Sequence, residues 1–265
     1  MRNRKVVTKS PIKAGTLQNP GESIGLEIRR LLVEEVTFYI YIAAIFIFLA
    51  VQEWIKWFLK SPPFPLILTA LAGVVTIYST FKVRQIKRQL RDLRQGREGE
   101  KAVGQYLEGM RIKGYQVIHD IPSGENFNID HVLIGETGIY AIETKTISKP
   151  AKGRAYVDYD GKKITINGFV PDRDPIVQAK ASARWLRDLL KESTGRDLNV
   201  RGVVLYPGWY TSRQPRDAEV WVLNPKSLPA FVDHEKRVIS PEDVHLFTYH
   251  LGRYIRHNNK PGKSN

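Results

Sequence analysis

Two carboxylates that face each other on a short hairpin are the residues of this sequence best suited to chemistry. Residues 128–134 and 139–146 read as β-strands, and the turn residues 135–138 between them predict a hairpin. If the hairpin closes symmetrically, Asp130 on the first strand lies directly opposite Glu143 on the second. Carboxylates in that position repel each other and destabilise a sheet unless a counter-charge lies between them.

Lys145 completes the pattern, because side chains alternate along a strand and place it on the same face as Glu143. A divalent cation, Mg²⁺ or Mn²⁺, would supply the missing counter-charge, since both ions prefer carboxylate oxygens. The alternative is an ordinary exposed strand end at which Lys145 pairs with one of the acids. A slip of one residue in the register would also separate Asp130 from Glu143.

A third acid improves the metal hypothesis. Glu100 lies in line with the apolar stripe of a helix predicted over residues 97–112, one turn before Val103, so it is expected to face the core. An acid in that position needs a partner, because burying an unpaired charge is expensive. Gln178 lies in the first turn of a helix that is predicted to begin at Asp174, its N-cap, followed by Pro175. The residues around Gln178 indicate only an ordinary exposed side chain.

Several catalytic classes are excluded by missing residues. The chain has no Cys, which excludes disulfide scaffolds, Cys-ligated zinc and thiol catalysis. Its six His form no His-x-x-Glu-His pair, and His131 is expected to point away from Asp130 and to pack. Neither a phosphate-binding Gly-x-x-x-x-Gly-Lys loop nor a Gly-x-Ser-x-Gly elbow occurs.

A second predicted hairpin carries basic residues interleaved with tyrosines. Asp160-Gly161 predicts a tight turn between strands over residues 155–159 and 163–167. Such a surface suits contacts with phosphates and bases, and a solvated hairpin is the equal alternative. The candidate nucleic-acid contacts are Lys152, Arg154, Lys162 and Lys163.

Five ordered blocks of the sequence carry a family resemblance. They are Gly-Arg-Glu-Gly-Glu at 96–100, Asn-Ile-Asp-His-Val-Leu-Ile at 128–134, Gly-Ile-Tyr-Ala-Ile-Glu-Thr-Lys at 138–145, Asp-Pro-Ile-Val-Gln at 174–178 and Val-Arg-Gly-Val-Val at 200–204. In combination the sequence resembles the nuclease-related domain (NERD) family, which is placed among the PD-(D/E)xK phosphodiesterases. Asp174 stands where the family usually has Asn, and the resemblance covers about residues 95–205.

The resemblance implies a restriction-endonuclease-like core, which is a mixed sheet flanked by helices. It implies that Asp130 and Glu143 hold Mg²⁺ or Mn²⁺ together with the backbone carbonyl of Thr144. Lys145 would orient the attacking water or help to deprotonate it.

The resemblance also enlarges the expected catalytic set. Glu100 would match the acid that the family carries on its first helix, where it also serves the metal site. Gln178 would match the polar residue of a later helix.

The net charge points to an anionic partner. The 265 residues carry 41 Lys and Arg against 27 Asp and Glu, which is a formal net charge of +14. A basic excess of this kind favours nucleic acid or an acidic membrane surface.

Two long apolar segments near the N-terminus predict a transmembrane hairpin, with spans at about 36–58 and 64–81. Seven Lys and Arg precede the hairpin and seven follow it within residues 82–97, so both termini are expected to be cytoplasmic. The expected location is a prokaryotic inner (plasma) membrane with anionic lipid headgroups. A helical hairpin buried in a soluble core is the alternative.

The predicted organisation has five parts. They are a flexible basic arm (1–23), an amphipathic lead-in with the transmembrane hairpin (24–81), a basic amphipathic linker helix (82–95), a nuclease-related cytoplasmic domain (96–256) and a disordered tail (257–265). The linker helix favours homo-oligomerisation or binding to anionic lipid, and a solvated linker helix that continues the second span is the alternative.

The resulting hypothesis is a membrane-anchored, divalent-metal-dependent nuclease on the cytoplasmic side, with DNA preferred to RNA as its expected substrate. The alternative is a non-catalytic, membrane-tethered module for nucleic-acid binding or assembly on a nuclease-like scaffold.

Overall fold

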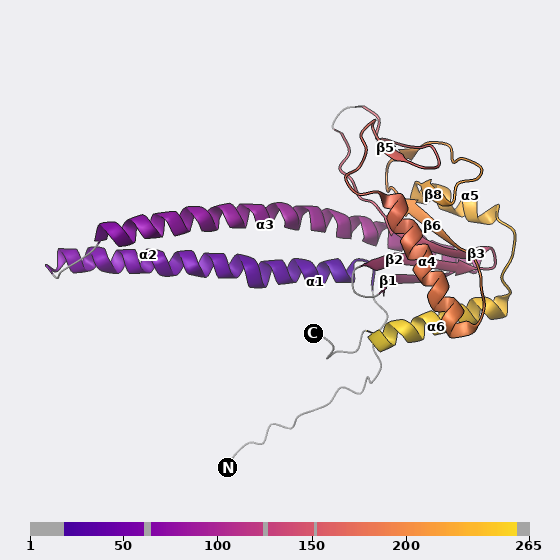
Figure 1. The fold of residues 1–265 in the computed structure, drawn as a ribbon, viewed down its shortest axis with the longest axis horizontal. Helices are drawn as coiled ribbons and strands as arrows, with labels where there is room; N and C mark the ends of the chain where they lie inside the picture. Colours follow the sequence, from indigo (N-terminus) through magenta and orange to yellow (C-terminus); the bar gives the residue numbers. More distant parts are fainter. Residues whose placement is uncertain (1–18, 61–64, 124–126, 151–152, 259–265) are drawn as a thin grey trace, which may run out of the picture. The chain divides into compact units, whose positions relative to one another are not determined.

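The computed structural model describes residues 19–60, 65–123, 127–150 and 153–258. The chain divides into two compact units, one of residues 22–98 and one of residues 1–21 together with 99–265 (Figure 1). Most of the predicted arm and tail, residues 1–18 and 259–265, therefore lie outside the described residues.

The first unit is built from long helices. Along the chain they are α1 (Glu22–Arg30), a π-helical stretch (Leu31–Val36), α2 (Thr37–Phe58) and α3 (Pro65–Glu108). Helix α3 joins the second apolar segment, the linker helix and residues 97–108 of the predicted helix in one continuous element, which is the alternative in which the linker continues the second span. Neither Gly96 nor Gly99 interrupts α3, although glycine costs a helix about 1 kcal/mol relative to alanine.

The apolar stripe of the linker region has its packing partner within the chain. Ile86 and Leu90 on α3 are buried against Ile28 of α1 and Leu31 of the π-helical stretch. Burial of four such side chains stabilises the pairing of the two helical segments. Association of whole chains through residues 82–95 stays a prediction.

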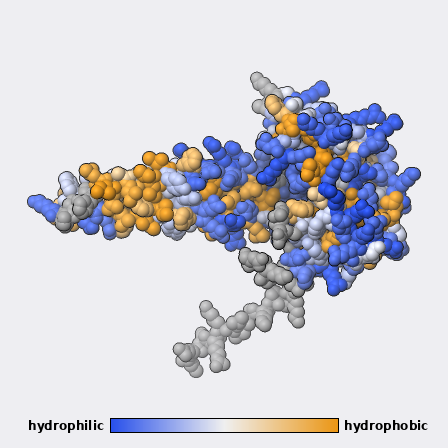
Figure 2. Space-filling model, in the orientation of Figure 1, coloured by the Kyte–Doolittle hydropathy of each residue, from blue (hydrophilic) through white to orange (hydrophobic). Residues whose placement is uncertain are grey.

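Two helical segments are long and apolar enough to be membrane spans, one within Glu22–Phe58 and one within Leu66–Lys113. Only 6% and 11% of their most apolar windows are buried, which is unlike a helical hairpin inside a soluble core. Figure 2 shows the corresponding surface of exposed apolar side chains along α2 and the first part of α3.

The second unit is organised around a five-stranded mixed sheet. Its strands, in spatial order, are β1 (Gln116–Pro122), β2 (Asn128–Gly135), β3 (Gly138–Thr144), β6 (Val200–Leu205) and β8 (Val220–Leu223). The first three are antiparallel, and β3, β6 and β8 are parallel.

Helices cover both faces of this sheet (Figure 1). On one face, α4 (Pro175–Thr194) and α6 (Pro241–Asn258) pack on β1, β2 and β3, with Leu186 and Phe247 fully buried. On the other face lie the last turns of α3, a 3₁₀ turn (Gly109–Lys113) and α5 (Leu228–Asp233). The predicted mixed α/β class, a sheet flanked by helices and preceded by two long apolar helices, is confirmed.

Helix α4 begins and ends where its sequence predicts. The Asp174 side chain accepts a hydrogen bond from the Ile176 amide at 2.9 Å, and Gly195 ends the helix in the left-handed conformation. These caps provide hydrogen-bond partners for backbone groups that have none within the helix at its ends.

A small second sheet was only partly expected. The predicted hairpin forms β4 (Tyr156–Tyr159) and β5 (Ile164–Ile166), and a short strand, β7 (Tyr210–Thr211), adds to β4 in parallel. Neither β7 nor α5 was predicted, and between β8 and α5 a 3₁₀ turn (Pro225–Ser227) completes the elements.

Candidate active site

Three acids lie in one row across neighbouring strands. The pairs His119↔His131 and Ile121↔Ile129 place Asp120 of β1 opposite Asp130 of β2. The pair His131↔Ile142 likewise places Asp130 opposite Glu143 of β3, in the register predicted from the sequence. We call Asp120, Asp130 and Glu143 the acid row.

Asp130 closes the end of the β2–β3 hairpin with its side chain. Its Oδ2 accepts a hydrogen bond from the Thr144 amide at 2.7 Å, beyond the last backbone pair of the ladder. The N–H and C=O of a strand residue point to the same side. The Thr144 carbonyl therefore also faces β2, where it is a further oxygen beside the acid row.

Glu143 is buried and meets Lys145 on the same face of the sheet. Lys145 Nζ donates to Glu143 Oε1 at 2.7 Å and to Gln178 Oε1, in the first turn of α4, at 2.9 Å. The second carboxylate oxygen, Glu143 Oε2, is buried and has no hydrogen-bond partner among the described residues. The structure thus brings Asp130, Glu143, Lys145 and Gln178 together.

Glu100 reaches the same region from α3. It is buried, as the apolar stripe predicted, and its charge acts on Asp130. The neighbouring Gly99 permits this approach, because a Cβ at that position would overlap the Thr146 side chain just after Lys145. A glycine is thus required for the helix to lie against the end of β3.

Asp120 was missed by the sequence analysis. It is 2% exposed and has a left-handed backbone conformation, with φ at 49°. Asn128 Nδ2 donates to its Oδ1 at 3.1 Å. A signal was present, since symmetric closure of the hairpin between residues 118 and 132 would have placed Asp120 opposite Asp130.

Burial and mutual repulsion raise the pKa values of the acids. Burial, followed by the charges of Asp120 and Glu143, raises the pKa of Glu100 to about 8. Burial, followed by the charges of Glu143 and Glu100, raises the pKa of Asp130 well above its usual range. Burial also raises the pKa of Glu143, although Lys145 acts against it. The single positive charge of Lys145 is therefore too little to offset the acids of the cluster.

The donor set fits a cation that keeps part of its water shell. Among the residues that the structure describes, no three His, Asp or Glu side chains form a ready-made metal cage. Mg²⁺ needs no such cage, because it is usually bound by one or two carboxylates with several waters. Asp130, Glu143 with its free Oε2 and the Thr144 carbonyl meet that requirement.

Two histidines pack on the opposite side of the same strands. His131 is fully buried, as expected for a residue that alternates with Asp130, and its Nδ1 lies 2.9 Å from His119 Nδ1. Burial and His119 lower the pKa of His131 to about 3, so it is neutral. His119 Nε2 lies 2.9 Å from Glu108 Oε1, which fixes the ring.

The predicted basic contacts lie on the small sheet. Lys162 and Lys163 donate their backbone amides to Asp160 Oδ1 in the turn between β4 and β5, and their side chains are exposed. Arg154 is exposed just before β4, and Lys152 lies outside the described residues. No contact between these side chains and the acid row occurs in the described part, so nucleic-acid contact stays a prediction.

Comparisons with known proteins identify the part of the chain that carries these residues. Residues 95–207 match the family model of the nuclease-related domain. An uncharacterized protein of Bacillus anthracis is 39% identical over 54 residues, which are 19% of this chain and 26% of that relative. The chain thus spans about a quarter of the curated relative that it matches, and no solved structure matches significantly. Residues 95–207, which carry Glu100, the acid row, Lys145 and Gln178, therefore form a nuclease-related domain.

Proposed function

We propose that this protein is a membrane-anchored, divalent-metal-dependent nuclease. The observation that carries the proposal is the placement of Lys145, whose Nζ contacts Glu143 Oε1 and Gln178 Oε1 beside the acid row. A lysine held by two acceptors at the edge of a cation site can orient a water molecule toward a phosphodiester.

The metal, when bound, lowers the pKa of a coordinated water and stabilises negative charge on the phosphate. Asp130 and Glu143 would hold it, with the Thr144 carbonyl, and Glu100 would join them as an outer acid. The residues of the chain supply orientation: the Thr144 amide holds Asp130, and Gln178 holds the Lys145 amine.

The anchoring part of the proposal is supported by the two apolar helices. Their exposed apolar side chains need a lipid environment, and basic residues flank the segment on both sides. We propose that the nuclease-related domain faces the cytoplasm, where DNA or RNA is accessible.

The test is a cleavage assay with the full chain in detergent micelles, on single- and double-stranded DNA and RNA, with and without Mg²⁺ or Mn²⁺. The expected result is metal-dependent cleavage that Lys145→Ala reduces at least about 100-fold. Lys236→Ala is the matched control. Lys236 is exposed, and its loop is hydrogen-bonded to the β2–β3 turn, which is at the opposite end of β2 and β3 from the acid row.

Cleavage that is equal in wild type and Lys145→Ala would contradict the proposed mechanism. Salt-sensitive binding of nucleic acid without any metal-dependent turnover would instead support a non-catalytic binding module on the same scaffold.

A further inference from the structure

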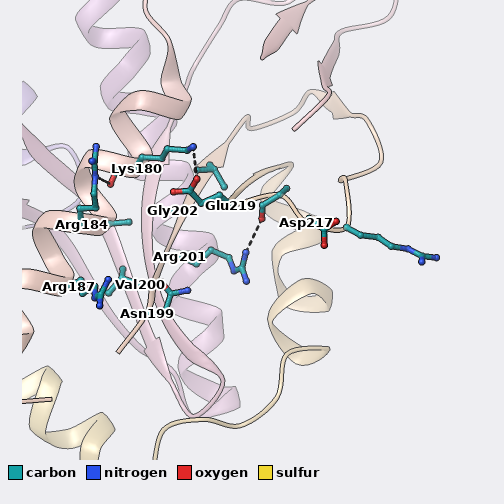
Figure 3. A pocket seen from close by; sticks show the side chains of 13 residues that line it. Lys180, Arg184, Arg187, Asn199, Val200, Arg201, Gly202, Asp217 and Glu219 are labelled. Atoms are coloured by element: carbon teal, nitrogen blue, oxygen red, sulfur yellow. Dashed lines mark hydrogen bonds and ion pairs between the residues drawn. The ribbon is translucent and has the colours of Figure 1, made fainter. Parts of the chain in front are cut away.

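Basic side chains gather in a cleft that is separate from the acid row. It lies between α4 and the beginnings of β6 and β8 and has a volume of about 620 Å³ (Figure 3). Ligand sites in proteins typically enclose ~300–1,000 Å³. Five basic residues line this cleft, against two acids: Lys180, Arg184, Arg187, Arg201 and Arg216.

Three of these residues form a stripe along α4. Lys180, Arg184 and Arg187 follow the spacing i, i+4, i+7, which places them on one side of the helix. At ~1.5 Å per residue the stripe is about 10 Å long. Phosphates along one strand of a duplex advance ~3.4 Å per nucleotide along the axis. The stripe therefore spans the distance of several backbone phosphates rather than of one.

The stripe lies on a different side of α4 from Gln178. Lys180 lies two residues after Gln178, which accepts the hydrogen bond from Lys145. Two residues correspond to about 200° around an α-helix, so the stripe faces away from Gln178 and Lys145 and forms a surface of its own.

Arg201 on β6 lines the cleft, but its side chain is engaged on the other face of the sheet. Its guanidinium lies over the Trp221 ring, 4.6 Å from the centroid, and its Nη1 donates to the Ala218 carbonyl at 3.1 Å. Trp221 packs on the α5 side of the sheet, so this guanidinium points away from the α4 stripe and is not counted among its phosphate ligands.

The charges of the stripe are available to a ligand. Arg184 makes no ion pair in the described part of the chain, and its Nε donates only to the Lys180 carbonyl. Arg187 pairs with Asp197 at 2.7 Å, and Lys180 pairs with Glu219 at 2.6 Å. All four of these paired side chains are at least a third exposed, so each pair contributes little and can exchange for phosphate.

We propose that this cleft binds the backbone of the nucleic-acid substrate several nucleotides away from the bond to be cleaved. The inference rests on the proposed function for the identity of its ligand. The length of the stripe favours a polynucleotide over a mononucleotide, and backbone contacts predict binding without sequence preference.

The test measures binding without turnover. The full chain in detergent micelles is titrated, in EDTA, against a fluorescent 30-base-pair DNA over a series of salt concentrations. The double variant Arg184→Ala/Arg187→Ala is expected to bind at least about tenfold more weakly and to lower the salt-dependence slope by ~2. Arg253→Ala, an exposed arginine on α6, is the matched control and is expected to stay within about twofold of wild type.

A second variant keeps the test independent of folding effects. Arg184→Glu reverses one charge that has no ion-pair partner among the described residues, so weakened binding with an unchanged melting temperature supports the cleft. Equal binding by wild type and both variants would overturn the inference, as would displacement of the DNA by micromolar AMP.

The outcomes separate this inference from the proposed function. If the wild type cleaves nucleic acid in a metal-dependent manner but both variants bind DNA as tightly as it does, the inference about the cleft is wrong and the proposed nuclease function stands. If the variants bind DNA more weakly but the wild type shows no cleavage with any metal, the inference about the cleft is supported and the proposed nuclease function is contradicted.

Discussion

Asp120 and Asp130 lie directly opposite each other on β1 and β2, between the backbone pairs His119↔His131 and Ile121↔Ile129. Asp120 is buried and Asp130 is half-buried, and Asp120 adopts a left-handed backbone conformation that costs about 1–3 kcal/mol in a non-glycine residue. The repulsion between facing acids and the strained backbone of Asp120 each lower the stability of the folded protein. Their combination at the end of the hairpin that carries Glu143 and Lys145 is typical of a functional site.

The repulsion among these acids predicts an unusual dependence of stability on pH. The pKa of Glu100 in the folded protein is about 8, and that of an ordinary glutamate is about 4.5. A raised pKa contributes stability that is complete below about pH 4.5 and is lost as the pH rises through 8. Without metal, the melting temperature is therefore expected to fall between these values.

Glu100→Gln tests this dependence, because glutamine keeps the shape of the side chain and cannot ionise. The variant is expected to be more stable than wild type at pH 8 in EDTA, by an amount on the order of a few kcal/mol. Both proteins should unfold alike near pH 4.5. Parallel melting curves across the whole range would show that Glu100 ionises normally.

Asp130→Asn separates the charge of this residue from its hydrogen bond. Asparagine can still accept from the Thr144 amide, which Asp130 holds at 2.7 Å, while the like charge next to Glu143 disappears. The variant is expected to melt higher than wild type in EDTA and to lose at least about 100-fold in metal-dependent cleavage.

Asp130→Ala is the companion variant. It removes the acceptor as well and leaves a buried amide unpaired, which costs about 1–3 kcal/mol. A melting temperature of Asp130→Asn below that of Asp130→Ala would contradict this account of the residue.

Gly99→Ala tests how α3 reaches the end of β3. The added methyl group would overlap the Thr146 side chain, so the helix must move and carry Glu100 with it. The expected destabilisation is about 1–3 kcal/mol, accompanied by weaker cleavage.

Gly96→Ala, one turn earlier in the same helix, is the control. Its nearest neighbour would be Ile24 Cδ1 at 3.9 Å, which is ordinary contact. Alanine is also the better helix former, so this variant is expected to be as stable as wild type or slightly more stable. Similar losses in both variants, in urea unfolding experiments, would exclude a specific role for Gly99.

The site was predictable wherever local patterns determine geometry. The turn at residues 135–138 sets the hairpin register, and period two along β3 places Glu143 and Lys145 on one face. The apolar stripe of α3 likewise predicted that Glu100 is buried. In each case the relevant contact is between neighbours on one element or across one tight turn.

The remaining features depend on contacts that are distant in the sequence. Helix α3 continues through Gly96 and Gly99 because packing on both sides of them, at Ile86 and Leu90 and at Val103 and Leu107, outweighs the weak preference of glycine against helix. Strand β7 has two residues and exists only because β4 offers an edge. The basic cleft joins α4 to β6 and the approach to β8, which no local pattern connects.

The central claim is that the acid row and its neighbours bind a divalent cation, and Mn²⁺ binding to the full chain in detergent micelles tests it most directly. Isothermal titration calorimetry of wild type is compared with Glu143→Gln, which neutralises the carboxylate whose Oε2 is buried and unpartnered among the described residues. The account predicts saturable binding by wild type, a rise in its melting temperature with Mn²⁺, and at least about tenfold weaker binding by the variant. Equal Mn²⁺ affinity in the two proteins, or no binding by wild type, would contradict it.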